Sequence, residues 1–195
     1  MTAIRLQDAA LARFARQGFD ATSLAEIAAD VGIKKPSIYA HFQSKDELYL
    51  SLIPRLVEAE LEHAGQVLHG GQEAVGQLRA YLQDIRTRYE NSEHVAFWFK
   101  ALLAPPLHIY DAVMAPMHVF MDSLEDIIRT AIKGSPLAGN RRGLSIETLT
   151  LTYMGLIDAL QSELIYGGAD KFERRLEAMW QVFETASGGP DLPRL

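Results

Sequence analysis

The chain has 195 residues, of which 48% are hydrophobic and 23% are charged, as is usual for a globular protein with a substantial core. Cysteine is absent, which excludes disulfide bonds and thiolate metal sites. No apolar run approaches the roughly 18 residues of a membrane span. The first residues lack the apolar stretch of a signal peptide. We therefore expect a cytoplasmic protein without a membrane partner.

The net charge of -6 is unevenly distributed along the chain. Residues 1–50 contain six basic and six acidic residues, so the whole acidic excess lies in residues 51–195. Between Gly32 and Lys45 there are three lysines and no acidic residue. A surface that meets the phosphate backbone of DNA needs this local absence of carboxylates. The pattern predicts a small DNA-facing module on a larger acidic body.

Apolar residues recur at spacings of three and four along almost the entire chain, which predicts an all-α fold with about nine helices. We expect an N-terminal three-helix helix-turn-helix domain over residues 1–50. A larger helical domain for ligand binding and dimerisation is expected over residues 51–195. The predicted helices span residues 4–17, 24–30, 36–42, 44–64, 72–90, 93–103, 108–132, 145–166 and 170–186. Pro54 should kink or break the fourth of these helices.

Two capping boxes and one glycine define the helix-turn-helix. Ser23 with Glu26 and Ser44 with Glu47 each have the spacing at which two side chains satisfy the free amides of a first helical turn. Gly32 follows the second helix and permits the turn. The third helix would be anchored by its apolar residues, with Lys34, Lys35 and the polar residues up to His41 pointing outward. The N-terminal part of such a helix reads bases in the major groove.

Several sequence blocks at fixed spacing extend this pattern. They are Ala9-Ala10-Leu11 with Phe14 and Gly18, Thr22-Ser23 with Glu26-Ile27-Ala28, Val31-Gly32, and Ser37-Ile38-Tyr39-x-His41-Phe42-x-Ser44-Lys45-x-x-Leu48. With these blocks, residues 5–52 resemble the N-terminal domain of the TetR (tetracycline repressor) family of bacterial transcriptional regulators. The resemblance implies phosphate contacts from Thr22 or Ser23, Tyr39, His41 and Lys45. It implies base contacts from Lys35, Pro36 and Ser37, and from Ala25, Lys34 and Ala40. Family members often carry a longer basic arm before the first helix, and here only Arg5 remains.

The last two predicted helices are apolar over an unusually wide face. Such helices at the end of a chain suggest pairing with a second copy, and the family resemblance implies the same two-fold four-helix interface. The expected interface residues are Leu149, Leu156, Leu160, Leu164, Phe172, Leu176, Met179, Trp180 and Phe183. The same residues could instead be buried within one chain.

Aromatic residues and methionines in the middle of the chain predict an apolar ligand cavity, because methionine adapts to irregular shapes. A few polar side chains would orient the ligand. The candidate residues are His94, Phe97, Trp98, Leu102, Tyr110, Met114, Met117, His118, Met121, Tyr153, Ile157 and Gln161. The methionine stripe is equally consistent with ordinary core packing.

Catalytic signatures are absent from the sequence: it has no serine elbow, phosphate-binding glycine loop or zinc-binding histidine pair. We therefore expect no enzymatic activity, cofactor or metal. The sequence favours a homodimeric repressor that binds a palindromic double-stranded DNA operator and is released by a small apolar or amphipathic effector. The alternative is a DNA-binding regulator that is controlled by a protein partner, or acts architecturally, without a small-molecule effector.

Overall fold

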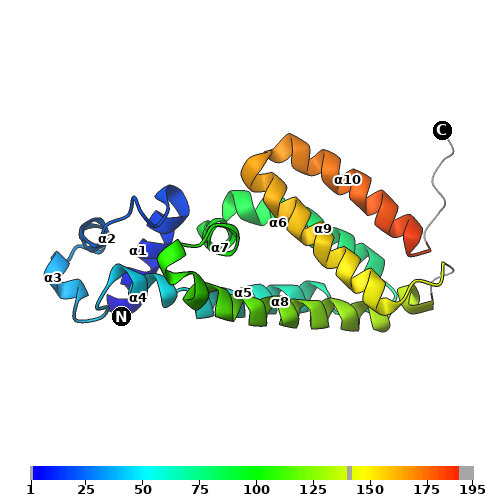
Figure 1. The fold of residues 1–195 in the computed structure, drawn as a ribbon, viewed down its shortest axis with the longest axis horizontal. Helices are drawn as coiled ribbons and strands as arrows, with labels where there is room; N and C mark the ends of the chain where they lie inside the picture. The colour runs from blue at the N-terminus through cyan, green and yellow to red at the C-terminus, as the bar shows by residue number, and fades with distance from the viewer. Residues whose placement is uncertain (1, 140–141, 189–195) are drawn as a thin grey trace. The chain divides into compact units, whose positions relative to one another are not determined.

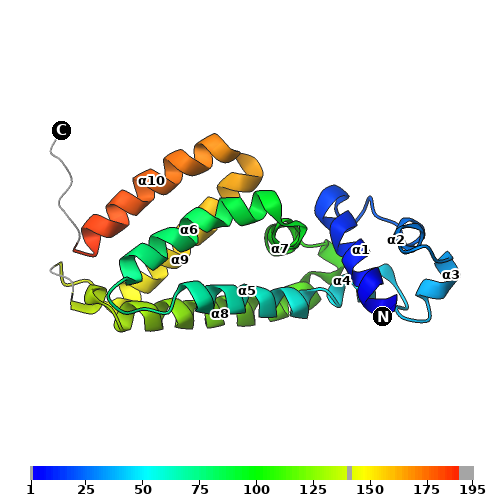
Figure 2. The same cartoon turned by 180° about the vertical axis from the view of Figure 1, so that it is seen from behind.

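The computed structural model describes residues 2–139 and 142–188. In this part of the chain, ten α-helices and two short 3-10 helices account for the regular structure, and no strand occurs (Figures 1 and 2). The α-helices are α1 Thr2–Gln17, α2 Leu24–Val31, α3 Lys35–Ile38, α4 Lys45–Leu50, α5 Ile53–Val67, α6 Ala74–Asn91, α7 Glu93–Leu103, α8 Tyr110–Lys133, α9 Ile146–Tyr166 and α10 Ala169–Ala186. The 3-10 helices η1 and η2 cover Leu107–Ile109 and Pro136–Gly139. The all-α prediction is confirmed. No helix among the described residues has both the length and the apolarity needed to cross a membrane.

The helix predicted over residues 44–64 is two helices. The last turn of α4 ends at Ser51, whose amide donates to the Glu47 carbonyl, and α5 begins at Ile53. Pro54 therefore occupies the first turn of α5, where its missing N–H would have no helical partner in any case. Pro116, in contrast, lies inside α8 without ending it. The predicted break at Pro54 is therefore the point at which a new helix, α5, begins.

The described chain forms two compact units. Residues up to Glu60 and the segment Tyr89–Phe120 belong to the first unit, while Leu61–Arg88 and the residues from Met121 onward belong to the second. In the first unit α1 lies beside α7. Phe14 of α1, Tyr49 of α4 and Phe97 of α7 meet edge to face or tilted, with ring centroids 5.0 to 6.0 Å apart. The domain boundary predicted at residue 50 stays a prediction.

In the second unit α9 and α10 run side by side (Figures 1 and 2). The Tyr153 hydroxyl is completely buried and donates to the Leu78 carbonyl of α6 at 2.7 Å. Two ion pairs connect α6 to α10, one between Arg79 and Glu177 and the other between Arg86 and Glu173. The core of this unit is therefore built by α6, α9 and α10 together.

Candidate DNA-binding surface

Local geometry shapes the helix-turn-helix as the sequence predicts. The Ser23 hydroxyl accepts from the Glu26 amide, and the Glu26 carboxylate accepts from the Ser23 amide in return. Gly32 has φ +76°, a left-handed conformation that ends α2 with little strain only for glycine. The helix α3 then starts with Pro36 in its first turn. A short turn therefore joins α2 to α3, and both capping interactions predicted for α2 are confirmed.

Burial separates the inner and outer faces of this module. Ile38 is 0% and Phe42 is 6% exposed, so these two side chains anchor α3 and the turn after it. Tyr39, which follows α3, is 49% exposed. The exposed residues among the predicted DNA contacts are Ser23, Ala25, Lys34, Lys35, Pro36, Ser37, Tyr39, Ala40 and His41. Most of the residues predicted to contact DNA are therefore exposed on this module.

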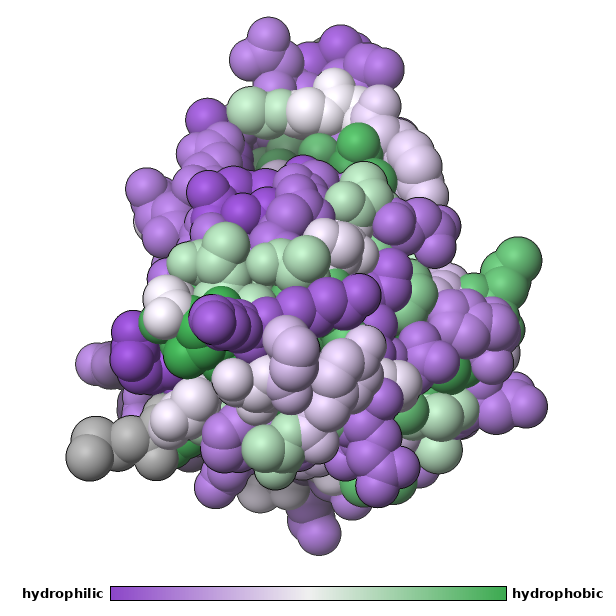
Figure 3. All heavy atoms as spheres, turned by 90° about the vertical axis from the view of Figure 1, so that its left-hand side faces the viewer, coloured by the Kyte–Doolittle hydropathy of each residue, from purple (hydrophilic) through white to green (hydrophobic). Residues whose placement is uncertain are grey.

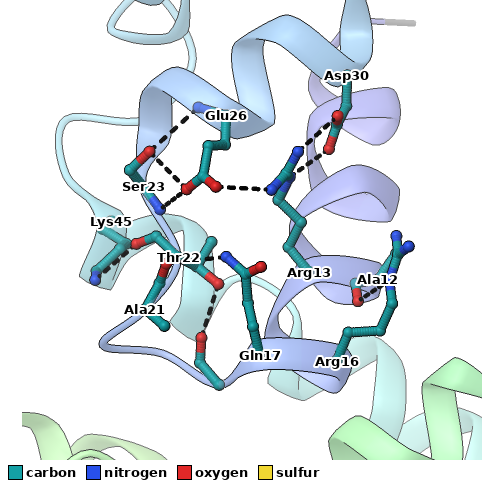
Figure 4. A network of polar contacts seen from close by, with 11 residues as sticks. Ala12, Arg13, Arg16, Gln17, Ala21, Thr22, Ser23, Glu26, Asp30 and Lys45 are labelled. Carbon is teal, nitrogen blue, oxygen red and sulfur yellow. Dashed lines mark hydrogen bonds and ion pairs between the residues drawn. The ribbon is translucent and has the colours of Figure 1, made fainter.

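Lys45 makes contacts that the sequence does not predict. Its ammonium donates to the carbonyls of Phe19 and Thr22, at 2.7 and 3.0 Å, and lies 4.0 Å from the centre of the Phe19 ring. The side chain therefore holds the loop between α1 and α2 (Figure 4 shows the bond to Thr22). Two of the three ammonium protons therefore serve the protein's own backbone, and the phosphate contact predicted for Lys45 stays a prediction.

Thr22 is also turned inward. The residue is 2% exposed, and its hydroxyl donates to the Gly18 carbonyl at 2.7 Å. The buried hydroxyl offers no accessible oxygen or proton to a phosphate in this conformation. Of the predicted pair Thr22 and Ser23, only Ser23 is exposed. We therefore retain Ser23 and withdraw Thr22 as a phosphate contact.

A charged cluster that the sequence analysis missed joins α1 to α2. The Arg13 guanidinium of α1 donates to Asp30, with one N–O distance of 2.9 Å, and to Glu26 at 3.0 Å (Figure 4). The hydrogen bond from Arg13 lowers the pKa of Asp30, and the hydrogen bonds from Ser23 lower the pKa of Glu26. Pairing with Asp30 raises the pKa of Arg13. Only the alternation of charge between residues 13, 26 and 30 could have indicated this cluster.

The space-filling view from the side of α2 and α3 shows a mainly hydrophilic surface with scattered pale apolar atoms (Figure 3). This face has no broad apolar patch of the kind that marks a protein–protein interface. Exposed lysines, a tyrosine and a histidine on such a surface are suited to contacts with phosphates and base edges.

Comparison with known proteins agrees with this geometry. Residues 6–52 match the family described as bacterial regulatory proteins, tetR family. Residues 6–52 thus carry the N-terminal domain of this family. The helix-turn-helix of this chain lies within the matched residues, and it corresponds to the DNA-binding module of these transcriptional regulators.

Curated relatives match the chain mainly through the DNA-binding module. The transcriptional activator FasR of Mycolicibacterium smegmatis is 36% identical over 70 residues, which are 36% of this chain and 32% of FasR. IcaR of Staphylococcus aureus, a negative transcriptional regulator of a biofilm operon, is 44% identical over 45 residues, which are 23% of this chain and 24% of IcaR. The chain thus matches a third or less of the length of these relatives.

Solved structures match the chain over nearly its whole length. A TetR-family regulator from Agrobacterium tumefaciens has a TM-score of 0.75 at 20% identity, covering 93% of this chain and 96% of its own. SmeT in complex with triclosan has a TM-score of 0.74 at 16% identity and covers 99% of both chains. FadR of Bacillus subtilis in complex with stearoyl-CoA has a TM-score of 0.67 at 16% identity, covering 96% of this chain and 99% of FadR. At these identities the likeness shows the fold.

The residues predicted to bind a ligand are divided between the two units. Phe97, Trp98, Met114 and Met117 are buried in the first unit, where Leu102 is half-buried. Tyr153, Ile157 and Gln161 are buried in the second unit, which also contains the half-buried Met121. His94, Tyr110 and His118 are exposed, in contrast to the expected inward orientation of these polar groups.

The residues predicted for the dimer interface are mostly buried within the single chain. Leu160 is 0%, Trp180 is 1% and Phe183 is 2% exposed. Leu149, Leu156, Leu164, Phe172 and Leu176 are likewise buried, and Met179 is half-buried. The least exposed of them have little surface left for a second copy, and their place in a dimer interface stays a prediction. Their apolar faces form the core of the second unit, which is the alternative that the sequence left open.

Proposed function

We propose that this TetR-family regulator is a repressor that binds a palindromic operator as a homodimer. The exposed face around α3, from Lys34 to His41, carries the proposal, since it has no acidic residue. Phosphate contacts give such a face affinity for any DNA, and base contacts from the start of α3 give it sequence preference. The named relatives include both an activator and a negative regulator. Repression is therefore the part of this proposal that needs a test in transcription.

A second copy would bind through the outer faces of α9 and α10. Leu151 is 50% and Val182 is 62% exposed, and Gly155 and Ala178 are exposed on the same two helices. Residues 151, 155 and 162 of α9 follow the spacing of one helix face. A two-fold interface on these helices would cover the exposed apolar side chains. Burial raises the pKa of Asp158 on this outer face, so this carboxyl is already partly desolvated.

A small apolar or amphipathic effector is the proposed regulator of DNA binding. The similar structures of SmeT and FadR contain triclosan and stearoyl-CoA. In this chain Gln161 is 8% exposed and makes no hydrogen bond within the described residues. The buried indole N–H of Trp180 also has no hydrogen-bond partner there. Unsatisfied buried polar groups each cost about 1–3 kcal/mol, which a ligand with matching groups would recover. That penalty applies to the Trp180 indole, whereas the Gln161 amide is not fully buried and is available to pair with a ligand. Gln161 is therefore our first candidate for orienting the effector.

The experiment that tests this function is selection of bound fragments from a pool of random duplex DNA, followed by a reporter assay with the selected site. We expect an inverted repeat, and lower reporter expression when the protein is present. Enrichment of no sequence would overturn sequence-specific binding. Higher expression from the site would replace repression with activation and leave DNA binding intact.

A further inference from the structure

The first unit contains a cavity of about 360 Å³ at the end of α1. Aromatic side chains from three parts of the unit line it: Phe14, Phe19, Tyr49 and Phe97. Ala104, Pro106 and the backbone at Gly18 complete the apolar part of the wall. This volume lies within the range of small-molecule sites. None of the residues predicted for the effector lines it except Phe97, so it is a separate site.

Three hydrogen-bond donors line the same cavity. Tyr49 is 3% exposed, and its hydroxyl makes no hydrogen bond to any residue that the structure describes. The Lys100 ammonium donates to the carbonyls of Ala15 and Arg16, which leaves one of its three protons without an acceptor. The Nε of Arg16 donates to the Ala12 carbonyl and lies 3.4 Å from Glu93. No hydrogen bond from its terminal Nη groups occurs within the described residues, although the guanidinium also acts electrostatically on Asp30.

The lining residues include two cations and no acidic side chain. A neutral ligand would fill the aromatic part of the cavity but leave the cationic donors unsatisfied. A carboxylate would accept from Tyr49, Lys100 and Arg16 together, and charge-assisted hydrogen bonds are the stronger kind. We propose that this cavity binds a small aromatic carboxylate, with its ring against Phe14 and Phe97 and its carboxylate toward the three donors.

A ligand bound in the cavity would act on the DNA-binding module through Phe19. The Phe19 ring lines the cavity and is also the ring beneath the Lys45 ammonium. A ligand that displaces this ring weakens the Lys45 contact and loosens the loop that leads into α2. Such a ligand lowers DNA affinity by the difference in its affinity for the two arrangements. This regulatory step rests on the proposed function, whereas binding of the carboxylate does not.

The test uses cinnamate as the probe and cinnamyl alcohol as its neutral analogue. Calorimetric titration of the full chain without DNA separates this site from the proposed function. We expect one cinnamate per chain, bound at least tenfold more tightly than cinnamyl alcohol. Absence of saturable binding, or equal affinity for the alcohol, would overturn the proposal whatever the protein does with DNA.

Two variants locate the site. Tyr49→Phe removes one oxygen and keeps the ring packing, so it should weaken cinnamate binding about tenfold, which corresponds to one hydrogen bond to a charged group. Tyr153→Phe is the matched control, because its buried hydroxyl already donates to Leu78 and lies in the second unit. Ala104→Trp should fill the cavity mouth and abolish binding. Unchanged affinity in Tyr49→Phe, or equal losses in both tyrosine variants, contradicts the assignment even if Ala104→Trp fails to fold.

Discussion

The Lys45 ammonium lies 4.0 Å from the centre of the Phe19 ring and donates to the Phe19 carbonyl at 2.7 Å. This contact joins the first turn of α4 to the loop between α1 and α2. The loop sets where α2 begins, so the position of the helix-turn-helix depends on it. Lys45 therefore orders the loop that leads into α2, and we expect this to be its main contribution to DNA binding.

Lys45→Met should lower the free energy of unfolding by about 1–3 kcal/mol, because it removes charge-assisted hydrogen bonds to two partly buried carbonyls. It should weaken binding to all DNA sequences alike without changing the salt slope. Lys34→Met is the control, since Lys34 is exposed on the DNA-facing surface. Denaturant titration and binding across a salt series measure both quantities. A slope about 0.9 shallower in Lys45→Met, with unchanged stability, would return Lys45 to phosphate binding.

Lys35→Ala should relax base preference at one position of each half-site, at a cost of about 1–3 kcal/mol there. Lys35 is exposed in the first turn of α3, the part of a recognition helix that meets base edges. A panel of single base substitutions measures the effect. If Lys35→Ala weakened binding equally for every substituted base, Lys35 would contact only phosphate. If it did not weaken binding at all, Lys35 would make no contact with DNA.

Acid should loosen the connection between α1 and α2. The folded-state pKa values of Glu26 and Asp30 are lowered, so their stabilising contribution is present above the unfolded pKa values and is lost as pH falls through the folded ones. Arg13→Gln should reduce this acid sensitivity by removing the partner of Asp30. Thermal unfolding of the wild type and of Arg13→Gln between neutral and acid pH measures this loss of stability. Parallel stability curves for the two proteins would contradict this role of Arg13.

Val182→Glu and Leu151→Glu should produce folded monomers that bind a palindromic operator weakly. Both side chains are at least half exposed, so glutamate is tolerated in one chain and becomes costly only when a partner covers it. Val119→Glu is a matched control, because Val119 of α8 is 61% exposed. Leu160→Glu, in contrast, should unfold the second unit. Sedimentation decides between these outcomes, and a dimer that persists in both outer-face variants would place the interface elsewhere.

Local signals in the sequence were sufficient for the DNA-binding module. The capping serines and the glycine at position 32 act over three or four residues, so spacing alone predicts them. The contacts of Lys45 could not be predicted because its acceptors lie 23 and 26 residues away, and no periodicity indicates such a contact. The burial of the predicted interface residues within one chain could not be foreseen for a related reason. A broad apolar face shows that a helix is buried but not which helix covers it, and α6, α9 and α10 cover one another within the chain.

Binding to an operator with altered half-site spacing tests the central claim most directly. Two α3 helices in a symmetric dimer must enter successive major grooves about 34–36 Å apart. The selected operator is compared with a version that has about five base pairs, half a helical turn, inserted between its half-sites. We predict a loss of at least about a hundredfold in affinity, because the half-turn moves one half-site to the opposite face of the duplex. Equal affinity for the original and half-turn sites would contradict a dimer that reads both half-sites through α3.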